Sequence, residues 1–332
     1  MIPLSVLDLA PIVEGGDAAT SFRNSAGLAQ AAERLGYARF WMAEHHSMPG
    51  IASAATAVAL AFVGTHTSTI RIGAGGVMLP NHAPLTIAEQ FGTLESLFPG
   101  RIDLGLGRAP GTDQAAAYAL RRNLAADQNQ FPQDVVELMG YFRGQEARVR
   151  AIPGEGLDIP LWILGSSLYG AQLAAALGLP YAFASHFAPR MMMEAIAVYR
   201  DRFEPSDQLD RPYVMLGYNV FAADSDEEAQ LLATSVQQAF VALRTGNAMQ
   251  LPPPVAGYAD TLPLEVRAGI ESALSCSAIG TRETVKSDIE AFVERTGADE
   301  LMVTSQIYDH AARLRSYEIL ADAVGLVSPA RA

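Results

Sequence analysis

Short apolar runs rich in β-branched and aromatic residues recur along the chain, and a helical or loop-plus-helix segment follows each run. Alternating strands and helices predict a parallel sheet. Eight such strands most economically close into a barrel with catalytic groups at the carboxyl ends of its strands, although an open doubly wound sheet also fits the pattern. The predicted strands are residues 4–9, 38–42, 70–74, 102–106, 161–164, 181–184, 214–221 and 301–304.

The spacing between the predicted strands is uneven. A long stretch, residues 109–160, follows the fourth strand, and an even longer one follows the seventh. Within the second stretch, residues 246–263 contain three consecutive prolines and no clear periodicity. They predict an irregular insertion after the helix of strand seven rather than a domain linker. Because no low-complexity tail or short-period repeat interrupts the pattern, we expect one barrel domain over residues 1–332.

Composition narrows the function classes. The 332 residues are 50% hydrophobic, enough for a large core, and a barrel typically needs roughly 250 residues. The net charge of -13, from 23 Lys+Arg and 36 Asp+Glu, argues against nucleic-acid or anionic-membrane binding, since a phosphate backbone demands a clustered basic face. The only cysteine, Cys276, fits a reducing compartment. No basic n-region opens the sequence, and the longest small-apolar run, residues 51–64, is too short for a bilayer. We expect a cytoplasmic protein.

Polar groups follow the first three predicted strands. Glu44, His45 and His46 come directly after the second strand, and Gly75-Gly76 ends the third. In a barrel, groups at these positions meet at one mouth. Adjacent glycines let the backbone approach a flat ligand without interference from a Cβ atom, although a bulge or a tight strand end explains them equally. A surface histidine pair is the simpler explanation of the first group.

Two later strand ends together predict an anion site. Arg108 ends the fourth strand among small residues, and a guanidinium can donate two parallel hydrogen bonds to phosphate. Gly165, Ser166 and Ser167 lead into a predicted helix over residues 168–177, whose N-terminus favours anions. A structural ion pair and ordinary serine capping are the simpler explanations of each alone. The glycines around Arg108 do not form a dinucleotide fingerprint, because the third comes one place too late and a proline interrupts the turn.

Five separated motifs resemble the flavin-dependent, bacterial luciferase-like monooxygenases, and the resemblance covers nearly the whole chain. They are WMAEHH at 41–46, IGAGGVMLP at 72–80, FPGRIDLGLGR at 98–108, LGSSLY at 164–169 and AFASHF at 182–187. The last two, together with LDLAP at 7–11, are similar to the YhbW-like subgroup of that family. The motifs occur in the same order as in the family.

The resemblance implies a TIM barrel that binds FMN at its C-terminal mouth, commonly as a homodimer. It makes His45 the catalytic histidine, with Glu44 and His46 beside it, one of them as a support for the loop. It implies a non-proline cis peptide at Gly75-Gly76 beside the flavin ring. Carried over in the same way, the FMN phosphate site consists of Arg108, Gly165, Ser166 and Ser167.

The implied reaction uses reduced FMN and O2. A C4a-peroxyflavin would pass oxygen to a small organic substrate, with His45 as acid/base or hydrogen-bond donor. Since the sequence contains no nicotinamide fingerprint, reduced flavin is expected from a separate NAD(P)H-dependent flavin reductase. Two departures matter: Gly107 replaces the reactive cysteine of luciferase light-emitting subunits, and Ser166 replaces a glutamate of their phosphate turn. The first puts luminescence in doubt, and the second alters the charge of the phosphate site.

Three alternatives remain at this stage. An oxidoreductase using the deazaflavin F420 shares the superfamily fold, and a non-catalytic flavin-binding protein would hold FMN without oxidising a substrate. A metal-dependent barrel hydrolase is the third, built on His45, His46, His82 and His186. The sequence lacks an H-x-H pair after the first strand and an H-E-x-x-H helix, so no metal is expected.

Overall fold

The computed structural model describes residues 2–108, 114–120, 130–145 and 148–326. Residues 109–113, which contain the proline and the third glycine of the segment around Arg108, lie outside the described residues. The strands are β1 (Leu4–Asp8), β2 (Arg39–Met42), β3 (Arg71–Met78), β4 (Ile102–Gly107), β5 (Leu161–Gly165), β6 (Tyr181–Phe183), β7 (Val214–Ala222), β8 (Ser277–Gly280) and β9 (Glu300–Thr304). The α-helices are α1 (Ala18–Leu35), α2 (Thr56–His66), α3 (Pro84–Leu97), α4 (Gln114–Leu120), α5 (Phe131–Arg143), α6 (Leu168–Leu177), α7 (Met192–Asp201), α8 (Asp226–Arg244), α9 (Leu264–Ala273), α10 (Arg282–Thr296) and α11 (His310–Val324). Short 3₁₀ helices are η1 (Leu79–Asn81), η3 (Pro189–Met191) and η4 (Tyr258–Thr261).

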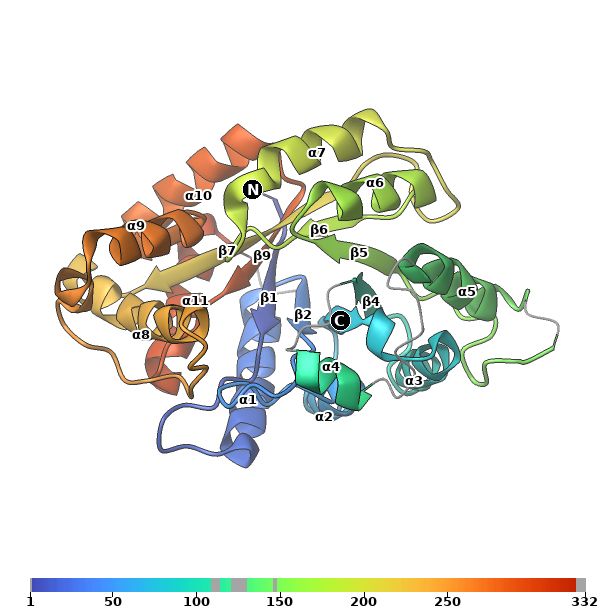
Figure 1. The fold of residues 1–332 in the computed structure, drawn as a ribbon, viewed down its shortest axis with the longest axis horizontal. Helices are drawn as coiled ribbons and strands as arrows, with labels where there is room; N and C mark the ends of the chain where they lie inside the picture. Colours follow the sequence, from blue (N-terminus) through green and yellow to red (C-terminus); the bar gives the residue numbers. More distant parts are fainter. Residues whose placement is uncertain (1, 109–113, 121–129, 146–147, 327–332) are drawn as a thin grey trace.

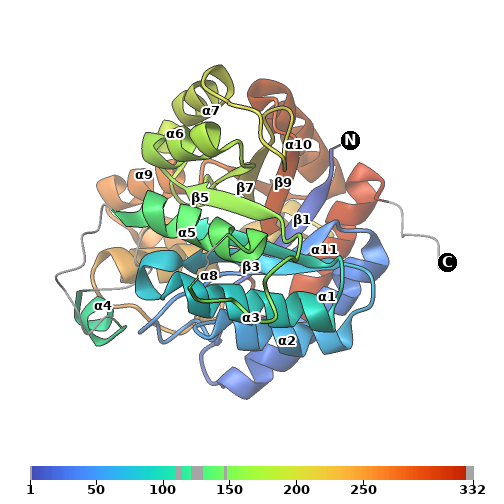
Figure 2. The same ribbon diagram turned by 90° about the vertical axis from the view of Figure 1, so that its right-hand side faces the viewer.

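The strands form a closed parallel barrel. β1 to β6 pair in chain order, β6 pairs with β7, and β9 lies between β7 and β1. All eight predicted strands are present in this ring, as β1 to β7 and β9, so the barrel prediction is confirmed. Helices α1, α2 and α3 cover one side of the ring and α6, α7 and α10 the other (Figures 1 and 2).

The sequence prediction omitted one strand. β8 pairs in parallel with the second half of β7, from Asn219 to Ala222, whereas β9 pairs with the first half, from Met215 to Asn219. β7 therefore pairs with three strands, β6, β8 and β9, and β8 lies outside the eight-stranded ring. Its four residues, sequence SAIG, are too short to give a clear strand pattern.

The predicted insertion after the helix of strand seven covers one edge of the barrel mouth. Residues 246–257 are largely irregular, and η4 and α9 extend the excursion up to β8. Leu251 is buried, donates its N–H to the Ile12 carbonyl at 2.9 Å and accepts the Glu14 N–H at 2.8 Å. Gln238 of α8 donates to the Pro253 carbonyl at 2.9 Å. These bonds attach the insertion to the loop after β1 and to α8.

Strand alternation divides the apolar side chains into two cores. On β1, Leu4 and Val6 face outward and pack under the helices, while Leu7 faces the barrel interior. The interior cluster contains Trp41 and Trp162, whose rings meet edge to face with centroids 5.2 Å apart. Because large side chains fill this middle layer, the barrel is a packed core rather than a pore.

A network of charges closes the interior at the N-terminal ends of the strands. The buried Asp103 accepts hydrogen bonds from Arg39 Nη1 at 2.8 Å and from Arg71 Nη2 at 2.6 Å. The buried Glu300 accepts from Arg39 Nε at 3.0 Å and from the Tyr213 hydroxyl at 2.8 Å. Both carboxylates are thus shared between several donors, which offsets the cost of burying them.

Candidate active site at the barrel mouth

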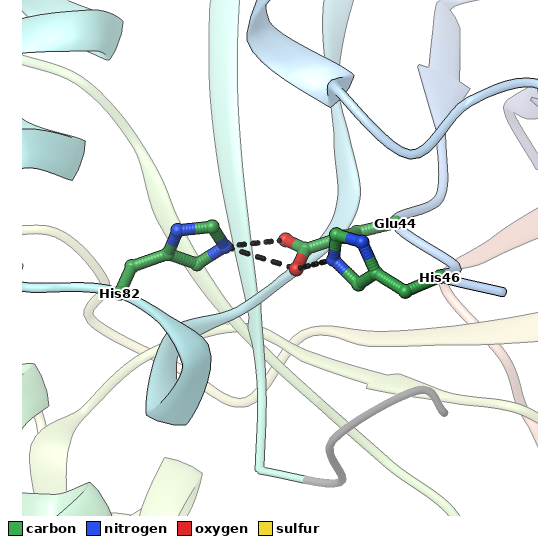
Figure 3. Close-up of side chains that lie close together, drawn as sticks. All are labelled: Glu44, His46 and His82. Carbon is green, nitrogen blue, oxygen red and sulfur yellow. Dashed lines mark hydrogen bonds and ion pairs between the residues drawn. The ribbon is translucent and has the colours of Figure 1, made fainter. Parts of the chain in front are cut away.

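The Glu44 carboxylate is the centre of a hydrogen-bonded cluster at the mouth. His46 Nε2 lies 2.7 Å from its Oε1, and His82 Nε2 lies 2.9 Å from Oε1 and 3.0 Å from Oε2. Figure 3 shows the carboxylate between the two imidazole rings. The Met78 N–H donates to Oε2 at 3.0 Å, and Asn81 Nδ2 donates to Oε1 at 3.3 Å. One side chain after β2 therefore holds the end of β3 and the turn that follows it.

These contacts decide the charge of Glu44. Burial raises the pKa of its carboxyl group, but the hydrogen bonds from His82 and His46 and from the Met78 N–H outweigh that effect and hold the pKa below its ordinary value. The carboxylate is therefore ionised at neutral pH. The ligand atoms of Glu44, His46 and His82 lie within 4.8 Å of one another, a spacing that a metal site also requires. Here both carboxylate oxygens already accept N–H donors, so we interpret the cluster as a hydrogen-bonded clamp.

The clamp borders the Gly75-Gly76 segment. The Glu44 N–H donates to the Gly76 carbonyl at 3.2 Å, and the Gly75-Gly76 peptide bond is cis. The β3–β4 register shifts between Ala74 and Val77, so the glycine pair is also the site of a strand irregularity. A Cβ atom on Gly76 would lie 2.7 Å from the Gly105 carbonyl oxygen, which leaves no room for a side chain there. Packing against β4 therefore requires glycine at position 76.

His45 differs from its two neighbours in the chain. Its Nδ1 atom is buried and has no hydrogen-bond partner among the described residues, whereas the ring as a whole remains partly exposed. Burial lowers the pKa of His45, an effect that Glu44 opposes and His46 reinforces. The structure thus groups Glu44 with His46 and leaves His45 as a separate imidazole.

The two parts of the predicted anion site lie side by side. The Arg108 guanidinium carbon sits 4.1 Å from the centroid of the Tyr169 ring, in the first turn of α6. Ser167 is the N-cap residue of α6, yet its side chain makes no capping hydrogen bond. Simple serine capping therefore does not account for this turn. Arg108 therefore lies beside the start of α6, where the first N–H groups of a helix favour anions.

Sequence reasoning left two histidines of this rim unassigned. His82 follows η1 and bonds Glu44, and His186 follows β6, where it is electrostatically coupled to His45. Both stand at strand ends in the sequence, which is the signal that identified His45. The contact between Glu44 and His82 spans 38 positions and depends on the pairing of β2 with β3.

Comparison with known proteins agrees with this architecture. The sequence model of the luciferase-like monooxygenase family matches residues 2–300. The luciferase-like monooxygenase of Escherichia coli strain K12 is 53% identical and covers 97% of this chain and 96% of its own. The N-acetyl-S-alkylcysteine monooxygenase of Bacillus subtilis is 32% identical over 98% of each chain. The crystal structure of apo-MsnO8 superposes with a TM-score of 0.88, at 34% identity, over 98% of this chain and 99% of that one.

The chain belongs to the luciferase-like monooxygenase family. Its eight-stranded parallel barrel is the fold that the family resemblance implied, and strand β8 after β7 is an addition to it. Among the described residues, no helix combines the length and the apolar character that crossing a membrane requires.

Proposed function

We propose that this protein is an FMN-dependent monooxygenase that uses reduced flavin and O2 to oxygenate a small organic substrate. The observation that carries the proposal is that Arg108 lies beside the uncapped start of α6, on the same rim as Gly75-Gly76. We assign the first pair to an anion and the glycine backbone to a flat ring. Phosphate and a flat ring are the two parts of FMN that need such surfaces.

The residues of the mouth fit FMN in three respects. Arg108, Gly165, Ser166 and Ser167 would hold the phosphate through charge-assisted and backbone hydrogen bonds. The Gly75-Gly76 backbone would support the ring, since no Cβ atom projects there. His45 offers a buried nitrogen without a protein partner. When bound, reduced flavin supplies the electrons that activate O2.

The protein's own contribution to the chemistry centres on His45. Its lowered pKa keeps the imidazole neutral at pH 7, so it can donate a hydrogen bond or exchange a proton with the reacting oxygen. Glu44 and His46 do not share this freedom, because each is engaged in the clamp. We assign them the positioning of the loop that carries His45.

Two partners complete the proposal. A separate NAD(P)H-dependent flavin reductase would supply reduced FMN, and an organic molecule would accept the oxygen. The Bacillus subtilis relative acts, by its name, on N-acetyl-S-alkylcysteines, so a substrate screen starts with such thioethers. The supporting observation is 32% identity over 98% of both chains, which includes the whole barrel mouth.

We also propose a homodimer that uses α2. Residues 57–64 of this helix carry no polar side chain, and its outward face carries Val58, which is 71% exposed, and Phe62. A helical segment that is apolar on all sides is normally buried. Val58→Glu is expected to convert a dimer to a monomer in sedimentation analysis. Leu264→Glu on α9, at another exposed apolar position, is the matched control and leaves the dimer intact. A wild-type monomer contradicts this part of the proposal.

The decisive experiment mixes the FMNH2-loaded protein with oxygenated buffer and follows flavin absorbance by stopped flow. An absorbance transient that free FMNH2 lacks, and that His45→Asn shortens, supports the monooxygenase. Oxidation at the rate of free flavin, despite FMN binding, contradicts it and favours a non-catalytic flavin-binding protein. If FMN does not bind but F420 does, the protein is a deazaflavin oxidoreductase instead.

A further inference from the structure

His186 stands across the barrel mouth from His45. His45 follows β2 and His186 follows β6, and these strands are four places apart in the ring of eight. The two histidines therefore stand at opposite points of the ring, and His45 contributes to the lowered pKa of His186. Like His45, His186 is partly exposed, while its Nδ1 atom is buried without a hydrogen-bond partner among the described residues.

The backbone around His186 fixes the position of its ring. Asn219 Nδ2 on β7 donates to the His186 carbonyl at 2.7 Å, and the neighbouring Ser185 hydroxyl donates to the Gly217 carbonyl at 2.7 Å. Gly217 follows Met215 by two residues, so both face the barrel interior. A Cβ atom on Gly217 would lie 2.1 Å from His186 Nδ1. The imidazole therefore occupies space that only a glycine leaves open.

This placement determines which nitrogen carries the proton. Buried N–H groups without a partner are rarer in proteins than under-satisfied acceptors. Nδ1 is thus the unprotonated nitrogen, and the proton resides on Nε2. Burial, and after it the proximity of His45, lowers the pKa of His186 to about 4, so the ring is neutral at pH 7. Because Nδ1 is the buried nitrogen without a partner, we assign the remaining donor, Nε2–H, to a ligand.

We infer that His186 is a flavin-binding residue whose Nε2–H donates to an acceptor atom of the flavin ring, from the wall opposite His45. The inference rests on the proposed function. The mouth of an eight-stranded barrel is only wide enough for one small ligand, so a flat ring on the Gly75-Gly76 surface reaches the far wall. The carbonyl oxygens and ring nitrogens of a flavin are the acceptors that a neutral imidazole donor matches.

The test compares FMN with riboflavin, which has the same ring but no phosphate. Dissociation constants come from quenching of flavin fluorescence in wild-type protein, His186→Leu and His186→Gln. Loss of one neutral hydrogen bond is expected to weaken both ligands by about threefold to tenfold in His186→Leu. His186→Gln keeps an N–H donor near the position of Nε2 and is expected to restore most of the affinity.

A second variant keeps the histidine but displaces its ring. In Gly217→Ala the new methyl group overlaps Nδ1, so both flavins are expected to bind more weakly although His186 is intact. The ¹⁵N NMR signals of the imidazole give a further readout. We expect the Nε2–H tautomer in the free protein and a shift of that signal on addition of FMN.

The outcomes separate the inference from the proposed function. If wild-type protein binds neither FMN nor riboflavin, the proposed function fails. If it binds both, and His186→Leu binds them equally well, the inference alone is overturned. A proton found on Nδ1 in the free protein overturns it as well.

Discussion

The two ends of the barrel interior treat their polar groups in opposite ways. At the N-terminal end, Asp103 and Glu300 each share their oxygens among several donors, and Arg39 bridges them. At the C-terminal end, buried polar atoms without partners remain among the described residues: Asp8 Oδ2, His45 Nδ1, His186 Nδ1 and Thr304 Oγ1. Trp162 Nε1, in the layer between, is also unpaired. The carboxylates at one end are fully paired, whereas the other end holds buried polar atoms without a partner among the described residues.

This difference indicates which end of the barrel interior contributes to stability and which end contributes to function. A buried charge network contributes to stability only when every member is paired, and that condition holds at the N-terminal end. Buried polar atoms without partners cost free energy, and a fold retains them where binding requires them. The Glu44 clamp is the exception at the mouth, since it is paired, and it accordingly supports the site rather than contacting a ligand.

The largest expected effect is a loss of stability at the N-terminal end of the barrel interior, where the buried carboxylates are paired. Asp103→Ala leaves Arg39 and Arg71 without their shared carboxylate and is expected to lower the free energy of unfolding by about 3–5 kcal/mol. Urea denaturation measures this loss. The folded fraction should bind FMN with wild-type affinity, because Asp103 lies below the tryptophan layer. A large loss of FMN affinity would show that the two ends are not independent.

An intermediate effect is expected at the clamp. Glu44→Gln keeps one acceptor oxygen but replaces the other with a donor, which faces the Met78 N–H or an imidazole. The free energy of unfolding is expected to fall by about 1–3 kcal/mol. Flavin binding should weaken as well, because the loop of His45 and the end of β3 lose their common anchor.

The same variant has a signature in its pH dependence. The pKa of the Glu44 carboxyl group is lower in the folded protein than its ordinary value of 4.5, which applies to the unfolded chain. The ionised carboxylate therefore stabilises the folded state fully above pH 4.5. That contribution is lost as the pH falls through the folded pKa. Wild-type protein should therefore lose stability more steeply below pH 4.5 than Glu44→Gln. Parallel stability curves for the two proteins would exclude a clamp built on the ionised carboxylate.

The next variant is expected to change FMN affinity but not the free energy of unfolding. Arg108→Ala removes an exposed guanidinium, so the free energy of unfolding should change by less than about 0.5 kcal/mol. FMN affinity is expected to fall by about 10-fold to 100-fold, since charge-assisted bonds to phosphate are strong. Riboflavin affinity should stay the same, in contrast to His186→Leu. Equal losses of affinity for FMN and riboflavin would show that Arg108 does not bind the phosphate.

The smallest effect is expected at the surface. Asp260→Ala removes an exposed ion pair in which Arg267 Nη1 lies 3.2 Å from Asp260 Oδ1. Solvent screens this pair, so the variant should lose less than about 1 kcal/mol of unfolding free energy. It is the matched control for Asp103→Ala, because each change removes one carboxylate. A similar loss in both variants would contradict the role given to the buried network.

Much of the fold follows from patterns along the chain. The strands of the ring are short apolar runs, and their alternation with helices indicates a parallel barrel before any contact is known. β8 was not predicted, because it has only four residues, two of them half-buried, and so short a segment gives no clear hydrophobic periodicity. α9 also escaped, since it follows an irregular proline-containing segment and its outward face carries the exposed Leu264.

Some features of the candidate site could be predicted from the sequence, and others could not. Strand-end position brought His45, Gly75-Gly76 and Arg108 forward as candidates. The family resemblance gave them roles, and these roles stay predictions. The clamp could not be predicted, because its bonds depend on the pairing of β2 with β3 and on the turn through η1. The opposite positions of His45 and His186 could not be predicted either, because they depend on closure of the ring between β6 and β7.

By itself, the sequence determined the barrel, its family and the identity of the groups at its mouth, because periodicity and strand-end position are local properties of a chain. The tertiary structure alone decided which of those groups are paired and which remain free. It gave Glu44 four donors and gave the Nδ1 atoms of His45 and His186 none among the described residues. Pairing depends on distances between strands, and those distances exist only once the barrel has closed.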